Sequence, residues 1–88
     1  MSRARIKMNL YEQDYHNELG ERLQSLRELN GFTRRAVAER LGVDWVYYED
    51  AEQGNRGITT LQLQTLAELY RTTVADMLEG IGPEQGEG

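Results

Sequence analysis

The spacing of leucines between residues 14 and 30 constrains the fold of this chain more than any other feature. Apolar side chains recur there at every third or fourth position, at Leu19, Leu23, Leu26 and Leu29. This spacing places them along one face of a helix, because an α-helix turns once in about 3.6 residues. Gly31 follows, at a position where glycine commonly ends a helix. The sequence therefore predicts an amphipathic helix over Asp14–Asn30.

Two further helices are predicted directly after Gly31. Thr33 is a good N-cap for a second helix that runs to Leu41, and Gly42 supplies the turn that follows. Asp44 is a good N-cap for a third helix that reaches about Gln53, just before a glycine. The side chains expected to pack inward from this pair are Val37, Ala38, Leu41, Val43, Tyr48 and Ala51.

Capping residues also mark the start of a fourth and a fifth helix. Either Thr59 or Thr60 caps the fourth, and Thr73 with Asp76 three residues later resembles a capping box that opens a short fifth helix, Val74–Glu79. The buried side of the fourth helix is predicted to consist of Leu61, Leu63, Leu66, Leu69 and Tyr70. The expected fold class is therefore all-α, with five helices.

The two ends of the chain have a different character. Ala4–Leu10 alternates apolar and polar residues, the period of a half-buried β-strand, which would need a partner such as the same segment of a second copy. The alternative is a flexible basic arm. Gly80–Gly88 is rich in glycine and acid and predicts a disordered tail. The expected organisation is an arm or dimerising strand over 1–13, a helical domain over 14–79 and the acidic tail over 80–88.

Composition excludes several classes of protein. The 88 residues suffice for one domain, and without cysteine the single His16 lacks the partners of a structural zinc site. No apolar run approaches the roughly 18 residues of a membrane span, and no signal peptide is present, so we expect a cytoplasmic protein. We find no phosphate-binding loop and no paired nucleophile and base, and expect neither an enzyme nor a cofactor.

Several short motifs occur in a fixed order along the helical region. They are Leu19-Gly20-Glu21-Arg22-Leu23, Gly31-Phe32-Thr33, Leu41-Gly42-Val43 and Glu52-x-Gly54. Together they resemble the Cro and phage-repressor family, often called XRE, and are most similar to actinobacterial members such as BldD. The resemblance implies a lambda-repressor-like helix-turn-helix domain. It also implies a sequence-specific DNA-binding transcriptional regulator, with a repressor of phage or actinobacterial origin as the expected kind.

The resemblance also implies roles for individual residues. In such proteins the second helix of the motif enters the major groove of DNA. The side chains expected to contact bases are Trp45, Val46, Tyr47 and Asp50. The side chains expected to contact phosphates are Thr33, Arg34, Asn55 and Arg56. Glu52 is expected to have a structural role within the motif.

The distribution of charge leaves two interpretations of function open. The chain carries a net charge of −5, and Gly42–Gly54 contains four acidic residues and no basic one, whereas DNA-binding surfaces are usually basic. One interpretation is a homodimer on double-stranded DNA, because two-fold symmetry doubles the base contacts of so small a domain. The other is a protein-interaction module, whose acidic and aromatic third helix binds a basic protein partner.

Overall fold

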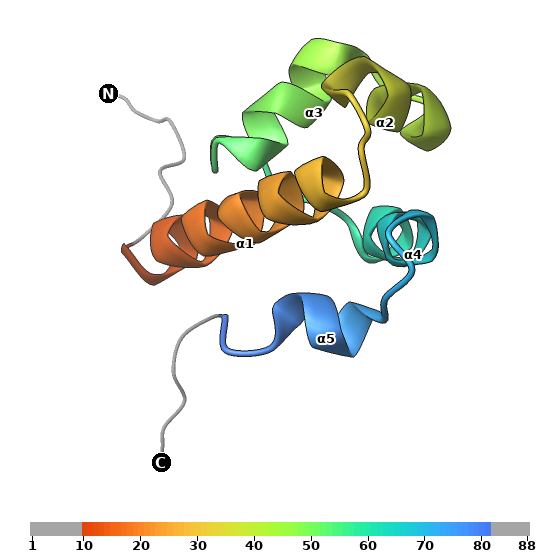
Figure 1. Cartoon of the computed structure of the whole chain (residues 1–88). Helices are drawn as coiled ribbons and strands as arrows, with labels where there is room; N and C mark the ends of the chain where they lie inside the picture. The colour runs from red at the N-terminus through yellow and green to blue at the C-terminus, as the bar shows by residue number, and fades with distance from the viewer. Residues whose placement is uncertain (1–9, 82–88) are drawn as a thin grey trace, which may run out of the picture.

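The computed structural model describes residues 10–81 and consists of five helices there (Figure 1). Their bounds are α1 Leu10–Leu29, α2 Arg34–Leu41, α3 Trp45–Glu52, α4 Thr60–Leu69 and α5 Val74–Leu78. In Figure 1, α2 and α3 lie on one side of the long α1, and α4 and α5 lie on the other. The predicted all-α fold is confirmed.

Threonine caps define where three of the helices begin. The Thr33 hydroxyl accepts a hydrogen bond from the Ala36 amide, and the Thr73 hydroxyl accepts one from the Asp76 amide. Thr59, not Thr60, caps α4, and it forms a full capping box with Gln62. Asp44 occupies the predicted N-cap position of α3, but its side chain makes no capping hydrogen bond.

One hydrophobic core joins all five helices. It consists of Leu19, Leu23, Val37, Ala38, Tyr48, Leu63, Leu66, Ala67, Tyr70 and Met77. The hydroxyls of Tyr48 and Tyr70 lie 3.0 Å apart and share a hydrogen bond inside this core. Burial raises the pKa of Tyr48 well above its ordinary value and the pKa of Tyr70 to about 12. Both hydroxyls are therefore neutral and satisfied, as buried polar groups must be.

Two leucines predicted to be buried are exposed instead. Leu29 has 82% of its surface exposed and Leu61 has 71%. Leu29 lies six residues after Leu23, which rotates it about 120° away from the buried face of α1. Leu61 lies two residues before the buried Leu63, on the opposite side of α4 for the same reason. The predicted apolar faces of α1 and α4 were therefore too wide and wrongly included both residues.

The predicted segment boundaries differ from the structure at both ends of the domain. Helix α1 starts at Leu10, four residues before the prediction, and within it the Gln13 side chain donates a hydrogen bond of 3.0 Å to the Gly54 carbonyl. Ile81, assigned to the tail, packs against the core. The rest of the predicted strand, residues 4–9, and the rest of the predicted tail, residues 82–88, lie outside the described residues. Within residues 10–81, no helix combines the length and the apolar character needed to cross a membrane.

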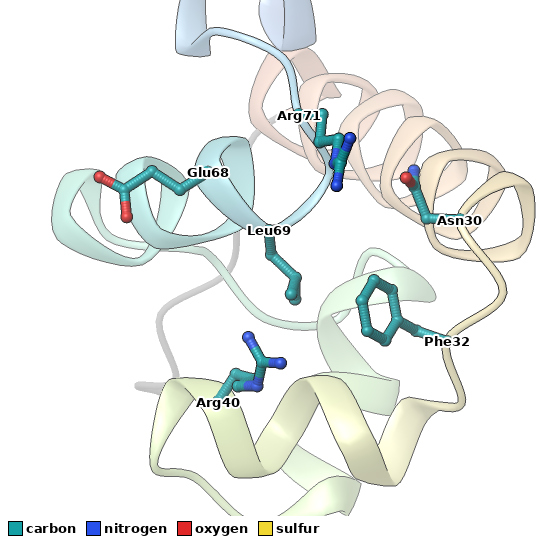
Figure 2. Close-up of a pocket in the computed structure, with 6 residues that line it drawn as sticks. All are labelled: Asn30, Phe32, Arg40, Glu68, Leu69 and Arg71. Atoms are coloured by element: carbon teal, nitrogen blue, oxygen red, sulfur yellow. The ribbon is translucent and has the colours of Figure 1, made fainter.

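An open hollow of about 530 Å³ lies between the end of α2 and the end of α4 (Figure 2). Its lining residues are Asn30, Phe32, Arg40, Glu68, Leu69 and Arg71.

Arg71 adopts a left-handed backbone conformation with φ of 61°, the only non-glycine residue among those described to do so. The Thr72 and Arg71 amides there close α4 by bonding the Ala67 and Glu68 carbonyls. Glycine is the usual residue at this position of a helix end.

We predict that Arg71→Gly stabilises the protein. The left-handed conformation costs a non-glycine residue about 1–2 kcal/mol, and the greater freedom of glycine in the unfolded chain offsets about 0.4–1 kcal/mol of that gain. The free energy of unfolding, measured by urea denaturation, should therefore rise by about 0.5–1 kcal/mol. Arg71→Ala removes the same side chain and keeps the strain, so it serves as the control. Equal stability of the two variants would contradict this explanation.

Candidate nucleic-acid interface

Helices α2 and α3 form a compact pair joined by a three-residue turn. Gly42 opens the turn with φ of 74°, and the Val43 amide bonds back to the Ala38 carbonyl at 3.0 Å. Helix α3 buries Tyr48, Ala51 and Glu52 against the domain, while Val46 at its start is 47% exposed. The predicted helix-turn-helix arrangement is therefore present, with the start of its second helix accessible.

Gly20 allows α1 to approach the end of α3 closely. A Cβ atom built at Gly20 would lie 2.2 Å from the Glu52 carbonyl oxygen and 2.7 Å from the Ala51 carbonyl oxygen. Backbone atoms cannot move aside as a flexible side chain can, so any larger residue would push the two helices apart. This glycine therefore helps to set the position of α3.

A buried cluster of charges connects α1, α2 and α3. The Glu52 carboxylate, whose side chain is fully buried, accepts hydrogen bonds from Arg27 at 2.6 and 3.2 Å and from Arg34 at 2.9 Å. The hydrogen bond to Glu52 raises the pKa of Arg27 above its ordinary value. Arg27 also donates to the Phe32 carbonyl at 3.0 Å. Glu52 thus has the structural role that was predicted, and it joins three helices.

Two further arginines lie on aromatic rings of α3. The Arg35 guanidinium lies 5.2 Å from the centre of the Trp45 ring, and that of Arg56 lies 4.2 Å from the centre of the Tyr47 ring. Such cation–π contacts contribute about 0.5–1 kcal/mol each at exposed sites. The Gln62 amide also donates to the Tyr47 hydroxyl at 3.4 Å. Helix α3 contains no basic residue, but the rings of Trp45 and Tyr47 each contact an arginine from a neighbouring element.

The tertiary structure changes the charge balance around α3. The four acidic residues between Gly42 and Gly54 are Asp44, Glu49, Asp50 and Glu52. Side chains from α1, α2 and the loop after α3 bring four arginines into contact with α3, namely Arg27, Arg34, Arg35 and Arg56. Arginines thus pair with Glu52 and lie near Glu49, so part of the acidic charge counted along the sequence is offset in space. This weakens the electrostatic argument against DNA binding.

The residues predicted to contact phosphates flank α3. Thr33 is exposed, and its hydroxyl caps α2. Arg34 is half-buried, because it bonds Glu52 and lies 3.8 Å from Glu49. Asn55 and Arg56 are exposed in the loop between α3 and α4. Arg34 is thus partly engaged within the domain, whereas Arg56 presents an exposed guanidinium.

The residues predicted to contact bases lie on α3 with unequal exposure. Val46 is exposed, whereas Tyr47 and Asp50 are half-buried. Trp45, predicted to face outward, is half-buried and packs partly against the core. Arg35, which the sequence analysis did not assign to the site, contacts this ring. No spacing rule relates Arg35 to Trp45, because the contact depends on how α2 crosses α3.

The acidic and histidine side chains of the described residues do not gather into a metal-binding group. Residues 10–81 hold no cluster of three or more histidine, aspartate or glutamate side chains that could bind a metal ion. His16 is half-buried and packs edge-on against Tyr15, with their ring centres 5.3 Å apart. The candidate site is the surface around α3, because the helix-turn-helix pair leaves the start of this helix exposed.

Comparison with known proteins identifies the family of this domain. A family model described as a helix-turn-helix domain matches residues 18–79, which include all of α2, α3, α4 and α5. This chain belongs to the helix-turn-helix family. The XRE-type resemblance predicted from the sequence is confirmed by this match and by the relatives below.

Three relatives of this helix-turn-helix protein illustrate the range of the family. The HTH-type transcriptional regulator DdrOP3 of Deinococcus deserti is 36% identical over 64 residues, covering 73% of this chain and 50% of the relative. The chain thus spans about half the length of this curated relative. The crystal structure of the clp gene regulator ClgR from C. glutamicum is 30% identical, with a TM-score of 0.68, and the match covers 73% of this chain and 82% of ClgR.

The resemblance to BldD is also confirmed by structure. The DNA-binding domain of BldD from S. venezulae is 28% identical, with a TM-score of 0.61, and the match covers 72% of this helix-turn-helix chain and 94% of the BldD domain.

We predict that Glu52→Gln destabilises the protein by about 3 kcal/mol, because it leaves two arginines facing a neutral side chain in a buried site. Urea denaturation measures the effect. Glu49→Gln is the matched control on the same helix, since Glu49 is more exposed and lies 3.8 Å from Arg34. That variant should lose less than about 1 kcal/mol. Equal losses for the two variants would show that the buried cluster does not hold the motif together.

Proposed function

We propose that this chain is a transcriptional regulator that binds double-stranded DNA with α3 in the major groove. The observation that carries the proposal is the α2–α3 pair, whose second helix is anchored by the buried Glu52 and exposes Val46 at its start. The major groove of B-form DNA is about 12 Å wide and admits such a helix. DdrOP3, named a transcriptional regulator, and the BldD DNA-binding domain support the same function.

The proposed contacts divide into two groups. Phosphate contacts position a protein on DNA without specifying the DNA sequence, and they are assigned to Thr33, Arg34, Asn55 and Arg56. Contacts to base edges are assigned to Trp45, Val46, Tyr47 and Asp50. Val46 and the edges of the two rings suit the methyl group of thymine, and the Asp50 carboxylate can accept a hydrogen bond from the amino group of cytosine. A bacterial or phage regulator with these contacts acts in the cytoplasm.

The alternative function, a module for a basic protein partner, receives less support. That interpretation depended on the sequence of the third helix, which has several acidic residues and no lysine or arginine. In the structure Arg27 and Arg34 bond Glu52, and Arg35 and Arg56 cover two rings of α3. The surface is therefore not a continuous acidic patch, and the helix-turn-helix relatives favour DNA.

We predict that Arg56→Ala weakens binding to all duplexes alike. Losing one phosphate contact should lower the salt dependence of binding by about one unit per half-site.

Asp50→Asn should instead weaken the free energy of binding by about 1–3 kcal/mol on the preferred sequence and little on random DNA. Anisotropy titrations of random and selected duplexes at several salt concentrations measure both effects. Arg40→Ala is the control, because Arg40 lines the hollow between α2 and α4.

The same titration decides between the two functions. Binding of the unaltered chain that never exceeds background on any duplex at low salt would contradict the DNA-binding proposal. A basic protein partner would then explain the aromatic and acidic side chains of α3.

We also expect the chain to bind DNA as a homodimer, since two-fold symmetry doubles the contacts of each domain. The part of the alternating segment that precedes α1, residues 4–9, is the proposed interface. Deleting residues 1–9 should therefore convert a dimer to a monomer in size-exclusion chromatography with light scattering, and should weaken DNA binding. A dimer that survives this deletion would place the interface elsewhere. Leu61→Lys then tests the exposed apolar position on α4.

A further inference from the structure

The arginines near α3 fall into two groups according to what they contact. Arg27 and Arg34 use their N–H groups to bond the Glu52 carboxylate. Arg35 and Arg56 instead place their guanidinium groups over the faces of Trp45 and Tyr47. A guanidinium held over a ring does not use its N–H groups on a carboxylate there, so these groups stay available for other acceptors.

The two stacks lie on opposite sides of α3. Trp45 and Tyr47 are two residues apart, which separates them by about 200° around a helix. Val46 lies between them and is 47% exposed. Arg35 comes from α2 and Arg56 from the loop after α3, so the two guanidinium groups reach α3 from different elements. The exposed face of the helix is therefore flanked by one cation on each side.

This arrangement matches the charge pattern of a DNA groove. A helix in the major groove has a phosphate backbone on each side and base edges in front of its exposed face. Arginine is suited to phosphate because its planar N–H groups can form two parallel hydrogen bonds. Stacking on a ring reduces the conformational freedom that the long arginine side chain would lose on binding.

We propose that Arg35 is a further DNA-contact residue, and that the Arg35–Trp45 and Arg56–Tyr47 stacks hold cations against the phosphates of the two strands that border the major groove. This inference rests on the proposed DNA binding. Trp45 and Tyr47 then act also as positioning residues, because their faces orient arginines while their edges remain directed toward bases. The cations that contact DNA beside α3 thus come from neighbouring elements.

The test measures anisotropy of a labelled random-sequence duplex with the full chain between about 50 and 200 mM salt, the range over which phosphate contacts dominate the change in affinity. Arg35→Ala should weaken binding about fivefold to tenfold per half-site at about 0.1 M salt and lower the salt slope by about one unit. Arg40→Ala, on the same helix but in the hollow, should change neither quantity.

A double-mutant cycle tests whether the ring positions the arginine. On random DNA, Trp45→Leu should weaken binding as much as Arg35→Ala, and the double variant should be no weaker than either single one. Trp45→Phe keeps a ring face and should restore most of the loss. Since Trp45 is the only tryptophan, its fluorescence in the free protein should change in Arg35→Ala and stay unchanged in Arg40→Ala. Circular dichroism checks folding, because Trp45 packs partly against the core.

The outcomes separate this inference from the proposed function. Arg35 is exposed, so the Arg35→Ala variant should fold normally. If the unaltered chain binds DNA and this variant binds it equally well with the same salt slope, the inference is overturned. The proposed DNA binding then still holds. Additive losses from Arg35→Ala and Trp45→Leu on random DNA would also overturn it, because the two residues would then act independently. If the unaltered chain binds no duplex, both proposals fail.

Discussion

The buried carboxylate of Glu52 bonds two arginines from different helices, and the position of α3 depends on this interaction. Arg27 reaches it from α1 and Arg34 from α2, so three helices meet at one charged group. A buried carboxylate without partners would be strongly destabilising, so the fold must keep both arginines near it. Apolar packing around Tyr48 and Leu23 supplies the remaining contacts. The exposed face of α3 is therefore oriented by charge as well as by the core.

This anchoring also determines which side chains remain for recognition. Arg27 and Arg34 neutralise Glu52, which removes that acid from the surface. Arg35 and Arg56 then occupy the faces of Trp45 and Tyr47. A helix that contains no basic residue thus acquires cations on both sides. The positive charge beside α3 therefore comes from side chains that are distant in sequence, rather than from α3 itself.

Much of the fold and part of the site could be predicted because the signals act over short distances. Thr33, Gly42 and Thr59 end or begin helices through bonds within one turn, so their roles follow from neighbouring residues. The assignment of inward faces was less accurate. Leu29 and Leu61 were predicted to be buried, but they lie about 120° and 200° around their helices from the buried Leu23 and Leu63. The Arg27 contact had a weak signal, since Arg27 continues the i+4 series of Leu19 and Leu23.

The sequence by itself determined the number and type of helices, the turn at Gly42 and the family resemblance, because capping, turn chemistry and apolar periodicity depend on residues a few positions apart. Only the tertiary structure decided the electrostatics of the site. The contacts Arg27–Glu52, Arg34–Glu52 and Arg35–Trp45 join residues on different helices. Their existence depends on how α1 and α2 pack against α3, and no local pattern encodes that geometry.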